Sequence, residues 1–110
     1  MSETYKKEIV QHIIKNLLHI QLLRIIQAKP TWGYHIKKQV EAEFNIKLRH
    51  GALYPALNLL EQKGLVKSSS QLVGRRVRKV YTISEGGDVY LKEYYNVLES
   101  QLSNGRLDKP

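Results

Sequence analysis

The chain has 110 residues, a length that suits a single domain with a modest hydrophobic core. It contains no cysteine, which excludes a disulfide framework, a zinc ribbon and a thiol nucleophile. The formal net charge of +8 favours a polyanionic partner, most simply nucleic acid.

The first predicted helix covers residues 5–29, where apolar residues recur at intervals of three and four. Its apolar face is wide enough to contact both the domain core and another surface, such as a second subunit. Pro30 ends this helix, and Thr31 is placed to cap a second helix that runs from Trp32 to about Glu43. The inner side of the second helix should consist of Tyr34, Ile36, Val40 and Phe44.

A third helix is predicted over residues 51–63. Pro55 lacks a backbone N–H and is tolerated only near a helix start, so it fixes the start to within one turn of Gly51. Gly64 then stands where a left-handed C-cap residue is expected. The buried side of this helix is a stripe of three leucines, Leu53, Leu57 and Leu60.

Two strands are predicted at about residues 65–69 and 76–83. Together they would form a hairpin over residues 65–83, which we call the wing. Ser70, Gln71 and Gly74 fall in the expected loop. The loop also contains Leu72 and Val73, and such apolar residues are unusual at the tip of a wing.

The wing segment carries positive charge without any acidic residue of its own. Its five cations are Lys67, Arg75, Arg76, Arg78 and Lys79. An edge hairpin that is kept soluble by charge is one explanation. Lysine is the usual residue for that purpose, however, and solubility does not explain why acids are absent. We therefore predict that Arg75, Arg76, Arg78 and Lys79 contact phosphates or the minor groove of DNA.

A last helix is expected over residues 84–102, with Ser84 as its N-cap. This helix makes up the C-terminal segment, residues 84–103. Residues 104–110 are expected to be a disordered tail. The apolar side of this helix consists of Val89, Leu91, Tyr94, Tyr95, Leu98 and Leu102.

The third helix also presents a polar side of His50, Tyr54, Asn58 and Gln62, with Lys47 and Arg49 just before it. One α-helix fits the major groove of B-DNA, where Arg pairs with guanine and Asn with adenine. Tyr and His can donate to phosphate oxygens. In the alternative interpretation Tyr54 packs on the domain and Asn58 is ordinary surface. We predict DNA contact for Lys47, Arg49, His50, Tyr54 and Asn58, because the N-terminal part of such a helix points into the groove.

No catalytic grouping is apparent, so we expect no enzyme. The four histidines stand without cysteine or an acid cluster, so we predict neither a metal site nor a cofactor. The sequence shows neither a signal peptide nor the stretch of about 20 apolar residues that spans a bilayer. A cytoplasmic protein with no membrane partner is therefore the expectation.

Three stretches resemble the PadR-like transcriptional regulators. They are residues 33–36 (GYHI), 51–66 (GALYPALNLLEQKGLV) and 78–87 (RKVYTISEGG). The resemblance extends from about Leu22 to Gly87, and the pattern LYPxLxxLExxGL is highly specific for the family. Departures from the family pattern are mild: Val80 replaces an aromatic residue and Ser84 replaces threonine.

This resemblance implies a mainly α fold with a small β-hairpin, in which a winged helix-turn-helix domain (residues 1–83) precedes a C-terminal dimerisation helix (84–103). It also implies a homodimer that binds an inverted-repeat operator on double-stranded DNA and usually represses the adjacent promoter. The apolar side of the last helix would then join two subunits. Some members bind planar drugs with a Trp on the last helix; this chain has none there, so no small-molecule effector is assigned.

Two other functions remain open. A non-specific architectural DNA-binding protein would have the same charge and fold but no preferred operator. A winged helix can also serve protein–protein assembly, although the basic wing argues against it.

Overall fold

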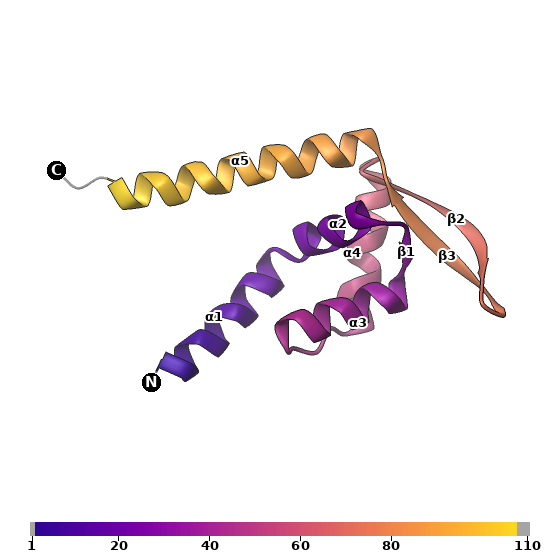
Figure 1. The fold of residues 1–110 in the computed structure, drawn as a ribbon, viewed down its shortest axis with the longest axis horizontal. Coiled ribbons are helices and arrows are strands. Elements are labelled where there is room, and N and C mark those ends of the chain that lie inside the picture. The colour runs from indigo at the N-terminus through magenta and orange to yellow at the C-terminus, as the bar shows by residue number, and fades with distance from the viewer. Residues whose placement is uncertain (1, 108–110) are drawn as a thin grey trace.

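The computed structural model describes residues 2–107 as five helices and three strands (Figure 1). Their order is α1 (Ser2–Asn16), α2 (Leu18–Ala28), β1 (Thr31–Trp32), α3 (Gly33–Phe44), α4 (His50–Gln62), β2 (Val66–Val73), β3 (Arg76–Ile83) and α5 (Glu85–Leu107). The strands form one antiparallel sheet in the order β1-β3-β2. This arrangement confirms the predicted winged helix fold.

The elements diverge from a small central body (Figure 1). Helices α2, α3 and α4 and strand β1 form that body, and the β2–β3 hairpin projects from one end of it. Helix α1 extends away from the hairpin, and α5 begins at the base of the hairpin, passes α2 and runs beyond the body, so the outer ends of α1 and α5 lie far from the hairpin tip (Figure 1). We call the β2–β3 hairpin, residues 66–83, the wing.

The expected single helix over residues 5–29 is wrong, because the structure divides it at Leu17 into α1 and α2. The break follows Asn16, whose side-chain amide donates to the His12 carbonyl at 2.9 Å. Asn competes with the backbone in this way and weakens a helix interior. The break allows α1 to point away from α2 (Figure 1).

Helix α2 is the centre of the hydrophobic core. It contributes five buried residues, Ile20, Leu22, Leu23, Ile25 and Ile26. They pack with buried residues of α3, α4, β2, β3 and α5 in one continuous cluster. Each fully buried Leu or Ile contributes about 1.5–3 kcal/mol, so this cluster dominates the stability of the fold.

Strand β1 was not expected from the sequence. Thr31 and Trp32 were assigned to a cap and a helix start, whereas they pair with Tyr81 and Val80 of β3. Two residues are too few to show strand periodicity, although Thr and Trp both favour strands. Thr31 does not cap α3; its hydroxyl instead forms a hydrogen bond with Nδ1 of His35 at 2.8 Å.

Helix α3 turns Ile36 and Val40 fully into the core, and Phe44 packs against the core as expected. The assignment of Tyr34 to the inner side is wrong, because 50% of that residue is exposed.

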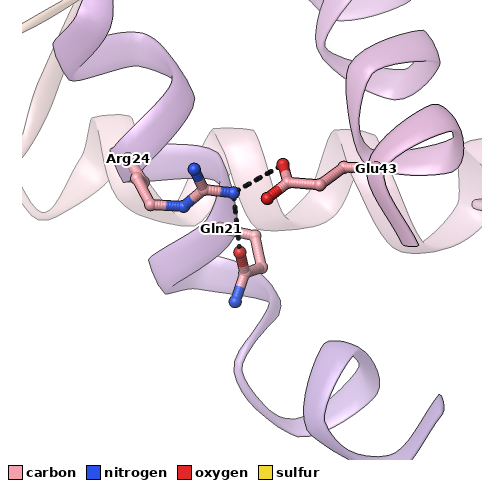
Figure 2. Close-up of polar contacts among 3 residues, drawn as sticks. All are labelled: Gln21, Arg24 and Glu43. Atoms are coloured by element: carbon pink, nitrogen blue, oxygen red, sulfur yellow. Dashed lines mark hydrogen bonds and ion pairs between the residues drawn. The ribbon is translucent and has the colours of Figure 1, made fainter. Parts of the chain in front are cut away.

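Arg24 joins α2 to α3 (Figure 2): its Nη2 donates to Glu43 Oε1 at 2.8 Å and to Gln21 Oε1 at 3.2 Å. Such an exposed pair contributes at most about 1 kcal/mol, so its main effect is to position α3.

Helix α4 has the predicted buried stripe of Leu53, Leu57 and Leu60. Gly64 has a φ of +75°, which confirms the predicted left-handed C-cap. The Gly64 N–H donates to the Glu61 carbonyl at 2.9 Å and the Leu65 N–H to the Leu60 carbonyl at 3.0 Å. This Schellman pattern ends the helix and turns the chain into the wing.

The wing strands are longer than expected, because β2 continues to Val73 and pairs there with Arg76. Residues 70 and 71 therefore lie in a strand and not in a loop. Gly74 and Arg75 form a two-residue turn, and only Gly74 has positive φ, at +64°. A glycine with positive φ in the first of two central positions is typical of a type II′ turn, which suits the twist of a hairpin.

Ser84 caps α5 as predicted: its Oγ accepts the Gly87 N–H at 3.0 Å and donates to the Gly64 carbonyl at 2.6 Å. The start of α5 is thereby tied to the end of α4.

The expected disorder is wrong for residues 104–107, where the backbone is helical, and 108–110 lie outside the described residues. Weak helix formers lower helix propensity but do not end a helix as proline does. Across residues 2–107, no helix is long and apolar enough to cross a membrane.

Candidate nucleic-acid interface

A hollow of about 310 Å³ lies between α4 and the wing. We call it the helix–wing hollow, and its lining is Trp32, Gly33, Tyr34, Tyr54, Asn58, Val77, Arg78, Lys79 and Tyr81. It brings together four residues that were predicted to contact DNA, namely Tyr54 and Asn58 of α4 with Arg78 and Lys79 of β3. Their separation in the sequence gave no indication that they share one space.

Tyr54 is held by a glycine. A Cβ on Gly33 would lie 2.8 Å from Tyr54 Cε1 and 2.9 Å from its hydroxyl oxygen, so only glycine leaves room for the ring. The ring also stacks on His50, with 5.6 Å between centroids and 20° between planes. It packs on the domain, as the alternative interpretation held, yet 38% of Tyr54 stays exposed and available to a partner.

Arg78 is positioned by Trp32. Its guanidinium carbon lies 5.4 Å from the centroid of the indole ring, within the range of a cation–π contact. Trp32 in turn packs on His35 at 5.1 Å between centroids. Because β1 pairs with β3, Trp32 lies directly beside the strand that carries Arg78. The sequence placed Trp32 only at the start of a helix and did not indicate this contact with Arg78.

Lys79 has an acidic partner that the wing sequence does not contain. Its Nζ lies 3.3 Å from Oε1 of Glu61 on α4, and Oε2 of Glu61 accepts a hydrogen bond from Ser68 at 2.6 Å. The Ser68 bond and then Lys79 hold the pKa of Glu61 below its usual value, and Glu61 raises the pKa of Lys79. The expectation that the wing cations lack an acidic counterpart is therefore wrong for Lys79.

Arg75 and Arg76 lie at the tip of the wing and are exposed. Among the described side chains, neither forms an ion pair. No described acidic side chain therefore neutralises their charge. They differ in this respect from Lys79, although the sequence grouped them together.

Lys47 and Arg49 lie elsewhere, on a larger hollow of about 1120 Å³ between α1, α3 and the start of α4. Its lining contains six cations, Lys7, Lys15, Lys37, Lys38, Lys47 and Arg49, and one acid, Glu41. Glu41 accepts the Leu48 N–H at 2.8 Å and pairs with Lys37 at 3.1 Å. The Leu48 N–H and the Lys37 ammonium hold the pKa of Glu41 below its usual value. Glu41 thus fixes the segment that leads into α4.

The N-terminus of α4 lies beside these cations. No side chain caps it, so its first backbone N–H groups are free of the usual side-chain acceptor. Such an end attracts phosphate. The predicted DNA-contacting residues thus form three groups: Lys47 and Arg49 before α4, the helix–wing hollow with His50 at its edge, and the wing tip.

The residues predicted for dimerisation differ in exposure. Val89, Tyr95 and Leu102 are exposed, whereas Tyr94 and Leu98 are partly buried. Only 1% of Leu91 is exposed, and it packs in the core of its own chain. Leu91 is therefore not exposed to a second subunit, contrary to the prediction. Across the described part of the chain, no three His, Asp or Glu residues lie close enough together to hold a metal ion.

Several solved structures share this fold. A PadR-like transcriptional regulator from Bacillus cereus strain ATCC 14579 matches with a TM-score of 0.74 and 22% identity, covering 90% of this chain and 99% of that one. A PadR family regulator from Eggerthella lenta DSM 2243 gives 0.72 and 23%, covering 98% and 97%. A PadR family regulator from Clostridium difficile R20291 gives 0.67 and 27%, covering 78% and 94%.

The sequence comparison points to the same group. Among curated proteins no sequence matches this chain significantly. Residues 22–93, more than half of the chain, match the transcriptional regulator PadR-like family. That segment runs from α2 to the start of α5 and contains the whole helix–wing hollow. The chain therefore belongs to the PadR-like family of transcriptional regulators.

Proposed function

We propose that this protein is a sequence-specific DNA-binding transcriptional regulator, a repressor, that binds an inverted-repeat operator as a homodimer in the cytoplasm. It performs no enzymatic step in this role. The family membership and the run of wing cations without an acidic residue between Leu65 and Ile83 both support DNA as the partner. The observation that carries the proposal is the helix–wing hollow, which places polar residues of α4 and cations of the wing around one space.

In this proposal α4 enters the major groove. His50, Tyr54 and Asn58 follow one another at intervals of four residues, so they share one face of the helix. All three are exposed. Asn58 is suited to pair with adenine, while Tyr54 and the uncapped helix start are suited to phosphate. Arg49, directly before the helix, is suited to guanine or phosphate.

The wing lies across the adjacent phosphate strand. Arg78 and Lys79 line the helix–wing hollow, so a strand held between α4 and the wing meets both cations. Arg75 and Arg76 extend the positive charge beyond that strand. Each cation that neutralises a phosphate releases a counterion and strengthens binding at low salt.

The dimer rests on exposed apolar side chains of α1 and α5. Ile9 and Ile13 on α1, with Val89 and Leu102 on α5, are large apolar residues that the chain leaves exposed. The outer parts of both helices run beyond the body on the side away from the wing tip (Figure 1). A second copy would cover these faces and place two α4 helices for the two halves of an operator.

The dimer is tested by the mass of the protein at micromolar concentration. We expect a dimer for the natural chain and a monomer for Val89→Asp with Leu102→Asp, because both side chains are exposed and buried charge opposes association. The matched control is Lys67→Asp on the wing, which should remain dimeric. A monomeric natural chain would overturn the role given to α5.

Sequence recognition is tested by nuclease footprinting on the DNA that flanks the gene. We expect two protected segments related by two-fold symmetry and about one helical turn, 10–10.5 base pairs, or a multiple of it apart. Asn58→Ala should change the preferred bases, and Asn96→Ala on α5 should not. Uniform protection of all DNA would favour an architectural protein. Undetectable binding even at low salt would favour protein–protein assembly.

A further inference from the structure

The wing tip carries an apolar pair that the proposed function does not use. Leu72 and Val77 are directly opposite each other on β2 and β3, beside the Gly74–Arg75 turn. Each is 72% exposed, more than any other large apolar residue in the described part of the chain. A cross-strand pair of this kind stabilises a hairpin by mutual contact. That contact alone leaves most of both side chains in water.

The pair faces the same side of the wing as the helix–wing hollow. Side chains alternate along a strand, so the pairs Leu72–Val77, Ser70–Lys79 and Ser68–Tyr81 share one face of the hairpin. Tyr81, Lys79 and Val77 also line the helix–wing hollow. The apolar pair is therefore the outermost part of the face that looks toward α4.

The charge around the pair defines what can cover it. Arg75 and Arg76 are its neighbours at the tip, and no acidic residue occurs between Leu65 and Ile83. An apolar spot with only cations beside it fits a partner that combines apolar walls with negative charge. The minor groove of DNA has this combination, since deoxyribose forms its walls, phosphates form its edges, and proteins place apolar side chains and Arg in it.

We propose that Leu72 and Val77 form an apolar tip that packs against the deoxyribose walls of the minor groove next to the major groove occupied by α4, while Arg75 and Arg76 hold the flanking phosphates. The proposal rests on the proposed function, because it needs α4 bound to DNA. It adds a contact that depends on shape and apolar area and not on charge. Part of the wing's contribution to DNA affinity should therefore persist at high salt concentration.

The test uses two double variants. The first carries Leu72→Thr and Val77→Thr together and is called the Thr variant. The matched control carries Leu72→Met and Val77→Ile together. Thr keeps strand propensity while it removes apolar area, and the control keeps both. We expect the Thr variant to bind duplex DNA about tenfold more weakly, about 1.4 kcal/mol, with an unchanged salt slope. The control should bind as the natural chain does. The single variant Val77→Thr, nearly isosteric, should show a smaller loss in the same direction.

Hydroxyl-radical cleavage gives a second readout, because the radical attacks deoxyribose along the minor groove. The natural chain and the control should protect the sugars beside each half-site, and the Thr variant should lose this protection while it keeps the contacts of α4. Equal affinity and equal sugar protection in all three proteins would overturn the apolar tip and leave the proposed function intact. A natural chain that binds no DNA would overturn both.

Discussion

Glu61 of α4 and Lys79 of β3 form an ion pair of 3.3 Å that joins the DNA-facing helix to the wing. Glu61 also accepts the hydroxyl of Ser68 on β2, so one carboxylate holds both wing strands to α4. Lys79 lines the helix–wing hollow, where the proposed phosphate strand passes. Glu61 therefore lowers the positive charge offered to DNA while it fixes the position of the wing.

Replacement Glu61→Gln should tighten DNA binding at low salt. The amide keeps an acceptor for Ser68 and removes the charge that neutralises Lys79, so one more cation is available to phosphate. Binding titrations over a range of salt concentrations should show the slope of log affinity against log salt steeper by roughly one. The control Glu93→Gln on α5 should leave the slope unchanged. Weaker binding by the Glu61 variant at every salt concentration would contradict this function for the pair.

Acidic pH should destabilise the start of α4 through Glu41. Its folded-state pKa lies below the ordinary value of 4.5, chiefly because the Leu48 N–H donates to it and also because of Lys37. A lowered pKa gives stabilisation that is complete above the unfolded-state pKa and is lost as pH falls through the folded value. Natural chain and Glu41→Gln should therefore differ in thermal midpoint at pH 7 and converge toward pH 3. A difference that stays constant with pH would contradict this.

Two of the three wing arginines, Arg76 and Arg78, should contribute to binding without regard to the DNA sequence. Arg76→Ala and Arg78→Ala should each lower the salt slope by roughly one and weaken specific and random DNA about equally. Arg78 also packs on Trp32, so its loss should be the larger of the two. Lys92→Ala, an exposed cation on α5, is the matched control. Unchanged affinity in the double Arg variant would refute the wing assignment.

Gly33→Ala should displace Tyr54. The added methyl would lie 2.8 Å from the ring, and relief of such overpacking costs about 1–3 kcal/mol of stability. DNA affinity should fall because Tyr54 leaves its place in the helix–wing hollow. In a Tyr54→Ala background the same glycine replacement should cost much less, which a double-mutant cycle measures. Additive effects of the two replacements would show that Gly33 acts through something other than Tyr54.

The parts of the fold that follow from periodicity and local chemistry were predictable. The leucine stripe of α4, its Gly64 cap and the Ser84 cap each depend on residues near one another in the sequence. The break at Leu17 was not predictable from apolar spacing, because α1 and α2 continue the same apolar pattern. Strand β1 needed its partner β3, fifty residues away in the chain, to exist at all.

The sequence predicts which residues belong to the candidate site but not which contacts they make in the folded chain. Arg78 and Lys79 look equivalent in the sequence, yet one lies over Trp32 and the other pairs with Glu61. Those partners come from β1 and α4, so only the folded chain brings them together. Gly33 is a similar case. The sequence does not indicate that Tyr54 lies against Gly33, and only the fold shows that the Tyr54 ring needs a residue without a side chain there.

The central claim is that this protein recognises one DNA sequence above others. The most direct test is the ratio of its affinities, at physiological salt, for the DNA upstream of its own gene and for random DNA of equal length. We expect a ratio of about a thousand or more, the range of specific regulators. A ratio near one would contradict the account and leave a basic winged helix that binds DNA without choosing a site.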